Sequence, residues 1–225
     1  CHKSDLTDYK VYPDHTEYTV KGTKFHFAQP QPRDITIQLV MLKHLCKYLE
    51  IELNTDFSGL QVPPGRSSFL EGKNGIKIID SSYNAHIISV ESILGMAKEL
   101  KADHKWFVIG DIVDQGAIEH REHEKLADII INAKPEHVVL VGRRTKKYTY
   151  PKLKDAKFKV KSTDDAKEAL AYLEKELTGK ETVIFKGSQY LEWIIEKLLK
   201  NPEDADKLPR REKGAIKRRA KRGLN

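Results

Sequence analysis

From Ile76 onward, short apolar runs alternate with longer segments in which apolar residues recur at helical spacing. The short runs predict strands and the longer segments predict helices. The expected strands cover residues 76–80, 106–110, 137–142, 158–160 and 182–186. After the fourth of them, Ser162 with Asp165 three residues later predicts the start of a helix capped by Ser162. Because parallel neighbouring strands need crossover connections, which are usually helical, this alternation predicts an α/β domain with a mainly parallel sheet.

The first part of the chain has a different pattern. Residues 16–20 and 23–27 flank Lys21-Gly22, which predicts a β-hairpin. A single apolar stripe over residues 35–49 predicts a helix with Cys46 on its buried side. The Pro63-Pro64-Gly65 stretch then predicts a domain boundary.

The positive charge is concentrated at the end of the chain. The 225 residues carry 40 Lys and Arg against 33 Asp and Glu, a net charge of +7. Residues 208–225 contain eight basic residues and one acidic residue, which equals the whole net charge. The neutral body argues against a nucleic-acid-binding face on the folded part. We expect three parts: residues 1–63, residues 64–207, and a disordered basic tail at 208–225. The tail is either a solvated end or an arm for anionic lipid or nucleic acid.

Several protein classes are excluded. No apolar run approaches the ~18 residues of a membrane span. Cys1 and Cys46 are too few for a disulfide framework, which predicts a reducing, cytoplasmic setting. The chain has no Gly-rich phosphate loop of the standard kinds and no Ser nucleophile elbow. It begins with Cys rather than Met, so we expect an upstream portion.

Polar residues gather where the expected strands end, at 80–84, 110–111, 142–144 and 186–188. Because the carboxyl ends of parallel strands share one edge, this pattern predicts a site for a charged small molecule. The alternative is that the glycines in these segments only permit tight turns into helices. His120, His123 and Glu124 have helical spacing but no evident third ligand, so we expect a polar helix face and no metal site.

Three of these segments carry a family resemblance. Gly65-Arg66 with Asp80-Ser81-Ser82-Tyr83-Asn84-Ala85, then Val108-Ile109-Gly110-Asp111, then Phe185-Lys186-Gly187-Ser188, resemble ordered motifs of the Mur ligases, which build the peptide of peptidoglycan. Within that family they are most similar to the branch that adds D-alanyl-D-alanine to UDP-N-acetylmuramoyl-tripeptide. The resemblance covers about residues 65–199. It implies a Rossmann-like C-terminal domain preceded by the end of the central ATPase domain.

The resemblance also implies an activity. Mur ligases are ATP-dependent amide ligases in which an acyl phosphate forms and is attacked by an amino group. The implied partners are a UDP-muramoyl-peptide, an amino acid or dipeptide, and the upstream domains of a parent ligase. The implied cofactors are ATP and Mg²⁺, with the phosphate loop and most magnesium ligands upstream of Cys1. The 225-residue chain alone is therefore expected to be inactive.

Matching positions imply nucleotide contacts. Arg66 matches an Arg that meets the nucleotide, where a fixed cation suits phosphoryl charge. Asp80 matches an Asp that accepts hydrogen bonds from ribose hydroxyls. Tyr83 and Asn84 match positions beside the nucleotide. The structural alternatives are a surface Arg after a turn, a helix-capping Asp and a core aromatic residue.

Lys186 and Ser188, together with Asp111, match segments that line the incoming amino-acid substrate. Departures at Ser81, His86 and Gln189 leave the acceptor open, since Gln189 stands where the family has an Arg that could clamp a carboxylate. Folate polyglutamation and cyanophycin synthesis stay open as related activities. The alternative function is a non-catalytic module that binds a nucleotide or a precursor, with the basic tail contacting anionic partners.

Overall fold

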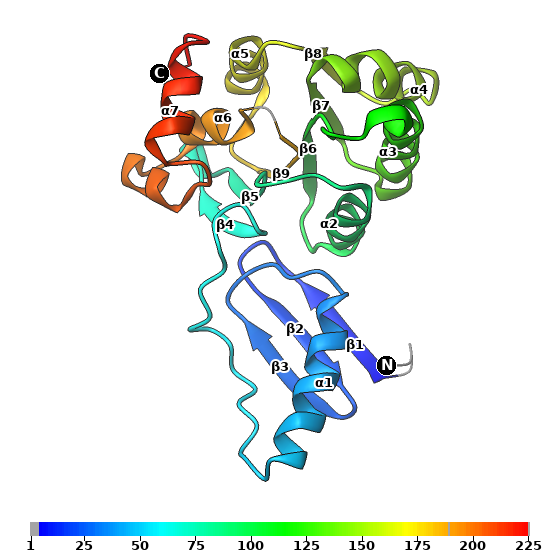
Figure 1. The fold of residues 1–225 in the computed structure, drawn as a ribbon, viewed down its shortest axis with the longest axis vertical. Coiled ribbons are helices and arrows are strands. Elements are labelled where there is room, and N and C mark those ends of the chain that lie inside the picture. Colours follow the sequence, from blue (N-terminus) through cyan, green and yellow to red (C-terminus); the bar gives the residue numbers. More distant parts are fainter. Residues whose placement is uncertain (1–4, 189, 225) are drawn as a thin grey trace.

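A computed structural model describes residues 5–188 and 190–224, and these residues form two sheets (Figure 1). The smaller sheet contains β1 (Leu6–Val11), β2 (Thr16–Val20) and β3 (Thr23–Phe27), paired antiparallel in chain order. The predicted hairpin is confirmed: Val20 pairs with Thr23, and Lys21 and Gly22 both have positive φ, as a tight two-residue turn requires.

Helix α1 (Ile35–Tyr48) packs on this sheet with one face only. Leu39, Val40 and the predicted core residue Cys46 are buried. The sheet contributes Tyr18, Phe25 and Phe27 to the same cluster. The other face of α1 exposes a stripe of large apolar residues at helical spacing, namely Ile37, Met41, Leu45 and Tyr48. The smaller unit therefore leaves half of an apolar helix in solvent.

The larger sheet has six strands in the order β4-β5-β9-β6-β7-β8. Its strands are β4 (Ser68–Glu71), β5 (Lys77–Ser81), β6 (His104–Gly110), β7 (His137–Val141), β8 (Val160–Thr163) and β9 (Glu181–Lys186). Only β4 runs antiparallel to its neighbour, so the predicted mainly parallel sheet is confirmed. The last strand in the sequence, β9, lies between β5 and β6.

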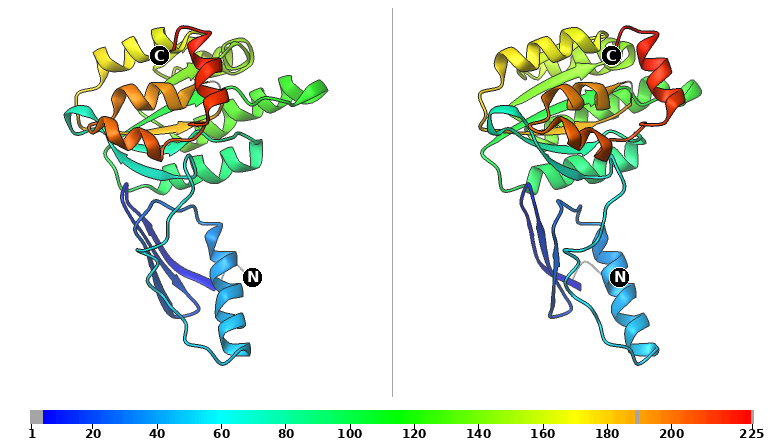
Figure 2. Two further views of the ribbon diagram at one scale, coloured as in Figure 1. Left: turned by 60° about the vertical axis from the view of Figure 1, so that its left-hand side comes forward. Right: turned by 90° about the vertical axis from the view of Figure 1, so that its left-hand side faces the viewer.

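Helices cover both faces of this sheet (Figure 2). They are α2 (Ile87–Glu99), α3 (Glu119–Ala133), α4 (Tyr150–Asp155), α5 (Ala166–Glu176), α6 (Leu191–Leu198) and α7 (Lys213–Ala220), with short helical turns at Lys73–Gly75, Gly116–Ile118, Thr145–Thr149 and Pro202–Lys207. Along β6, Phe107 packs into the cluster that includes α2 and α3, while Val108 packs into the cluster that includes α5 and α6. This alternation explains why the buried strands are apolar throughout.

Two local expectations differ from the structure. The short strand predicted at 158–160 begins at Val160, and the helix after it begins at Ala166. Its N-cap is Asp165, whose carboxylate accepts from the Lys167 N–H at 2.8 Å, whereas Ser162 was expected in that place. Both residues can cap a helix, and Ser162 is held within β8.

The segment expected to be a disordered tail is folded over its described residues, 208–224. Arg211 and Arg219 both pair with Glu196 of α6, at 2.6 and 2.9 Å. Arg210 pairs with the buried Glu192 of the same helix at 3.3 Å. Leu208, Ala215 and Leu224 are also buried. Three of the eight basic residues that suggested disorder are therefore paired with carboxylates on α6.

The two units touch each other near the expected boundary. Arg33 pairs with Glu99 at 2.6 Å, and the Gln29 side chain accepts from the Phe69 N–H at 2.7 Å. The Lys101 N–H donates to the carbonyl of Val11 at 2.8 Å. Pro63-Pro64-Gly65 lies in the irregular stretch between α1 and β4. This arrangement brings residues of both units to the same end of β5.

The carboxyl ends of β6 and β9 approach so closely that only glycine fits. A Cβ on Gly110 would lie 2.2 Å from the carbonyl oxygen of Ser188. A Cβ on Gly187, which has φ +139°, would lie 2.5 Å from the backbone nitrogen of Gly110. Both obstacles are backbone atoms, so neither can move aside cheaply.

We therefore predict that G187A lowers the free energy of unfolding by about 2–4 kcal/mol, through steric overlap and an unfavourable φ. The matched control is G95A in α2, where a Cβ would meet nothing within 4 Å. That change should raise stability by about 0.5–1 kcal/mol, because alanine favours helix. Urea denaturation of both variants measures the difference. Equal stability of G187A and the parent chain would contradict the predicted close approach.

Candidate functional site

Two hollows lie at the carboxyl ends of the strands of the larger sheet. We call the first the β5 pocket; it has a volume of about 360 Å³ and is lined by Gln31, Pro32, Ile35, Gly65, Arg66, Ser67, Ser81, Tyr83, Asn84, His86, Ser89, Ser92, Ile93 and Lys186. We call the second the strand-end cleft; it has a volume of about 680 Å³ and is lined by Asp111, Val141, Gly142, Arg143, Arg144, Asp164, Asp165, Ala166, Tyr190, Arg222 and Leu224.

The β5 pocket brings together four of the residues predicted from sequence. Arg66, Tyr83, Asn84 and Lys186 all line it, although they come from three separate segments of the chain. The smaller unit contributes Gln31 and its neighbours to the opposite side. The pocket is thus an inter-unit site, of the kind in which ligands are commonly bound.

Arg66 and Tyr83 form one wall of this pocket. The guanidinium of Arg66 lies 4.8 Å from the centre of the Tyr83 ring, a cation–π distance. Gly65, with φ +71°, lets the turn approach so closely that a Cβ there would lie 2.9 Å from the Tyr83 nitrogen. The Tyr83 N–H also donates to the Gly65 carbonyl at 3.3 Å. The Gly65-Arg66 turn is therefore fixed against the loop that follows β5.

Lys186 lies at the buried side of the pocket. Its ammonium donates to the carbonyl of Asn84 at 2.7 Å, and the residue is only 5% exposed. Burial is the main reason that the pKa of Lys186 falls to about 8, and the positive charge of Arg66 lowers it further. Two cations at one pocket suit an anionic ligand, which would relieve their mutual repulsion.

Asp80 directly precedes Ser81, which lines the pocket, but Asp80 itself is not a lining residue. Its carboxylate is fully buried, and Oδ1 accepts from the Ser82 N–H at 2.9 Å. Within residues 5–188 and 190–224, Oδ2 has no hydrogen-bond partner. Burial raises the pKa of Asp80 to about 6, with a smaller contribution from Glu192, while the Ser82 N–H and Arg210 act in the opposite direction. A buried carboxylate oxygen without a donor marks a position where a ligand hydroxyl would be favourable.

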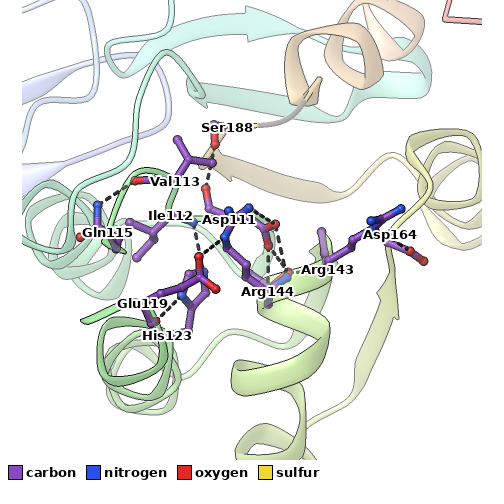
Figure 3. Close-up of polar contacts among 12 residues, drawn as sticks. Asp111, Ile112, Val113, Gln115, Glu119, His123, Arg143, Arg144, Asp164 and Ser188 are labelled. Carbon is purple, nitrogen blue, oxygen red and sulfur yellow. Dashed lines mark hydrogen bonds and ion pairs between the residues drawn. The ribbon is translucent and has the colours of Figure 1, made fainter. Parts of the chain in front are cut away.

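Asp111 organises the strand-end cleft (Figure 3). Its Oδ1 accepts from the Thr145 N–H at 2.9 Å and its Oδ2 from the Arg144 N–H at 3.3 Å. Its carbonyl accepts from the Ser188 hydroxyl at 2.8 Å. Asp111 and Ser188 therefore join the ends of β6, β7 and β9, and their direct contact with a substrate stays a prediction.

The arginines of the cleft differ in how they are held (Figure 3). Arg144 bonds to Glu119 and lies 3.6 Å from Asp111. Arg143 is largely exposed and lies 3.7 Å from Asp164. Arg143 and Arg144 were among the strand-end residues noted in the sequence. Tyr190 and Arg222 were not associated with the site, because no sequence pattern connects residue 222 to a strand end.

His123, considered above as a metal ligand, has a structural role. Its Nε2 accepts from the Ile112 N–H at 3.2 Å and its Nδ1 donates to the Glu119 carbonyl at 2.8 Å, which uses both ring nitrogens. His120 pairs with Glu124 on the surface of α3. Among residues 5–188 and 190–224, no group of three or more His, Cys, Asp or Glu side chains is arranged to hold a metal.

Comparison with known proteins decides the family. Residues 65–189, more than half of the chain, match the family model described as Mur ligase, glutamate ligase domain. The chain belongs to this family. The match includes most of the residues that line the two hollows, and the Mur ligase resemblance of the three sequence motifs is confirmed. Gln189, the most important departure from the motifs, lies outside the described residues.

Two curated relatives are UDP-N-acetylmuramoyl-tripeptide–D-alanyl-D-alanine ligases. The one from Rickettsia prowazekii is 28% identical over 173 residues, covering 77% of this chain and 37% of the relative. The one from Bacillus subtilis is 26% identical over 205 residues, covering 88% of this chain and 45% of the relative. The chain spans less than half the length of these relatives.

Solved structures show the same fold. The MurF ligase from Thermotoga maritima in complex with ADP matches with a TM-score of 0.68 and 18% identity, covering 95% of this chain and 47% of that one. MurF from Acinetobacter baumannii matches with a TM-score of 0.69 and 20% identity, covering 87% and 44%. The Mur ligase family is thus supported by sequence and by fold. Across residues 5–188 and 190–224, no helix has the length and apolar character of a membrane span.

The burial of Asp80 generates a pH-dependent prediction. The pKa of Asp80 is about 6 in the folded chain, and its ordinary value is 3.8. Above pH 6, the ionised carboxylate therefore lowers the free energy of unfolding by its full amount. This loss of stability becomes smaller as the pH falls from 6 towards 4. It is absent at a pH where Asp80 is neutral in both the folded and the unfolded chain. D80N should therefore raise the free energy of unfolding at pH 8 by on the order of 2 kcal/mol.

Urea denaturation between pH 4.5 and 8 measures this difference. The control is D155N at the exposed end of α4, which should have little effect at any pH. A loss of stability in D80N at pH 8, or a gain that does not depend on pH, would show that the buried charge of Asp80 is not the cause.

Proposed function

We propose that this chain is the C-terminal portion of an ATP-dependent Mur-type ligase that joins an amino acid or a dipeptide to a UDP-muramoyl-peptide. The observation that carries the proposal is the β5 pocket, in which Arg66, Tyr83, Asn84 and Lys186 meet between the two units. Both curated relatives are named as ligases of this class. The family membership of residues 65–189 supports the same conclusion.

The residues of the β5 pocket fit a nucleotide. Arg66 and Lys186 offer two cations for phosphate oxygens, and Tyr83 offers an aromatic face. The Oδ2 atom of Asp80, which has no hydrogen-bond partner among the described residues, suits a hydrogen bond from a ribose hydroxyl. ATP, when bound, supplies the phosphoryl group that activates a carboxylate. The related Thermotoga maritima structure was determined in complex with ADP, which supports a nucleotide in this family.

The pocket's position between the units suits a site that closes. Its lining residues come from both units, and Gln29, Arg33 and Val11 join the units beside it. A rotation of one unit towards the other would narrow the pocket and exclude water. In this proposal, residues 64–207 act as a lid that brings Arg66 and Lys186 to the nucleotide.

The strand-end cleft is the proposed place of the incoming amino acid or dipeptide. Arg143, Arg144 and Arg222 line it and give it positive charge, and Asp164 gives it negative charge. Ser188 fixes the position of Asp111 between this cleft and the β5 pocket. An acceptor in the cleft would therefore place its amine towards the β5 pocket, where the activated carboxylate would lie. Its own carboxylate would lie farther along the sheet edge.

The described residues show no magnesium-ligand group, so the proposed Mg²⁺ ligands belong to an upstream part of the parent ligase. The exposed stripe on α1 supports a missing neighbour, because Ile37, Met41, Leu45 and Tyr48 would be covered by the rest of a central domain. In this proposal residues 1–63 are the end of that domain, the parent works in the cytoplasm, and the 225-residue chain alone is inactive.

The alternative of a non-catalytic binding module with a basic arm has less support. Arg210, Arg211 and Arg219 each pair with a carboxylate of α6, which leaves fewer free charges for lipid or nucleic acid. The proposed ligase is tested by ATP-dependent phosphate release from the complete polypeptide that carries this chain. Release should require both UDP-N-acetylmuramoyl-tripeptide and D-alanyl-D-alanine. The 225-residue chain serves as the control and should release none.

We predict that R66A in the complete polypeptide raises the KM for ATP roughly 10–100-fold, because one charge-assisted contact to phosphate is lost. The matched control is R121A on α3, an exposed Arg outside both hollows, which should leave the KM for ATP unchanged. Phosphate release at varied ATP concentration measures both variants. An unchanged KM in R66A would remove Arg66 from the nucleotide site.

A further inference from the structure

The end of the chain is held firmly against the larger sheet. Arg211 and Arg219 converge on Glu196, and Arg210 donates to the carbonyl of Ser82 at 3.0 Å. Leu224, near the last described position, is only 5% exposed and packs with the cluster that contains α5 and α6. These contacts fix residues 208–224 in one place. We call these residues the C-terminal segment.

The C-terminal segment forms one wall of the strand-end cleft. Both Arg222 and Leu224 line the cleft, together with Gly142 and Arg143 from the end of β7. Gly223, with φ +69°, turns the chain between the two residues. As a result, Leu224 is buried while Arg222 remains exposed at the cleft. A cation from the C-terminal segment thus lines the same cleft as Asp111 and Gly142, which follow the ends of β6 and β7.

Arg222 differs from the other arginines of this region. Arg210, Arg211, Arg218 and Arg219 all pair with a carboxylate. Among residues 5–188 and 190–224, Arg222 has no ion pair and no side-chain hydrogen bond; its guanidinium lies 5.2 Å from the centre of the Tyr190 ring. Packing on a ring restricts a guanidinium but leaves its N–H edge free to donate.

A positioned guanidinium with free donors is suited to a carboxylate, which it binds through two parallel hydrogen bonds. The attacking amine of an incoming amino acid or dipeptide must face the reacting acyl group. The carboxylate at the other end of that molecule then points away from the β5 pocket. Arg143 and Arg144 also line the cleft, but both already lie near acidic side chains.

We propose that Arg222 binds the carboxylate of the acceptor and thereby selects acceptors with a free carboxyl end. The proposal rests on the proposed ligase function. It assigns a role in specificity to a segment outside residues 65–189, the part that matches the family model. Tyr190 acts as the positioning residue, since its ring supports the guanidinium of Arg222.

The test compares two acceptors in the complete polypeptide: D-alanyl-D-alanine and its C-terminal amide, which lacks the negative charge. We expect R222Q to raise the KM for D-alanyl-D-alanine roughly 10-fold or more, and to leave the KM for the amide within about 2-fold of the parent value. R222K should recover part of the loss, because it keeps the charge but not the fork. The KM for ATP should not change in either variant.

The matched control is R218Q, an exposed Arg of α7 that pairs with Glu212 and does not line the cleft. It should leave the KM for both acceptors unchanged. Equal KM increases for acid and amide in R222Q, or no increase at all, would overturn the role of Arg222 while the ligase function stands. If the parent polypeptide turns over neither acceptor, the proposed function itself fails and this inference fails with it.

Discussion

The contact between the ends of β6 and β9 is the constraint on which the rest of the site depends. Gly110 and Gly187 touch backbone to backbone, so Ser188 lies against the carbonyl of Asp111. Asp111 in turn holds the turn after β7 through two backbone N–H groups. Because β9 also carries Lys186 towards the β5 pocket, one close approach fixes the two hollows relative to each other. The positions of the side chains at both hollows therefore depend on a contact that is made almost entirely by backbone atoms.

The sequence was a good guide wherever a local pattern maps onto one edge of the sheet. Period and turn residues predicted the parallel sheet, strand ends predicted that Tyr83, Asn84 and Lys186 would gather, and the family resemblance added Arg66. It failed where charges meet across space. The basic residues after Leu208 looked like a solvated tail, but Glu192 and Glu196 lie on another helix and pair with them. Composition counts such charges without showing which of them are partners.

Burial is the second property that the sequence did not give. The ligand contact predicted for Asp80 stays a prediction, and the structure adds that its carboxylate is fully buried, with a pKa of about 6. Lys186, on the neighbouring strand, has its pKa lowered to about 8. Near neutral pH both groups are charged in a place that disfavours charge, and neither is needed to complete the hydrophobic core. Buried charged groups with shifted pKa values are typical of functional sites, and they lower the free energy of unfolding.

The position of β9 has a consequence for how the domain is made. β9 is the last strand in the sequence, but it lies in the middle of the sheet, where it pairs with β5 and with β6. Until residues 181–186 have left the ribosome, the position between β5 and β6 has no strand in it, although each of the two strands can already pack against α2. The pairing of Ile78 with Val183 spans about a hundred residues, a distance that slows folding. Residues 181–186 must therefore be synthesised before either hollow exists, and the exposed edges of β5 and β6 are the part of the nascent chain most in need of protection.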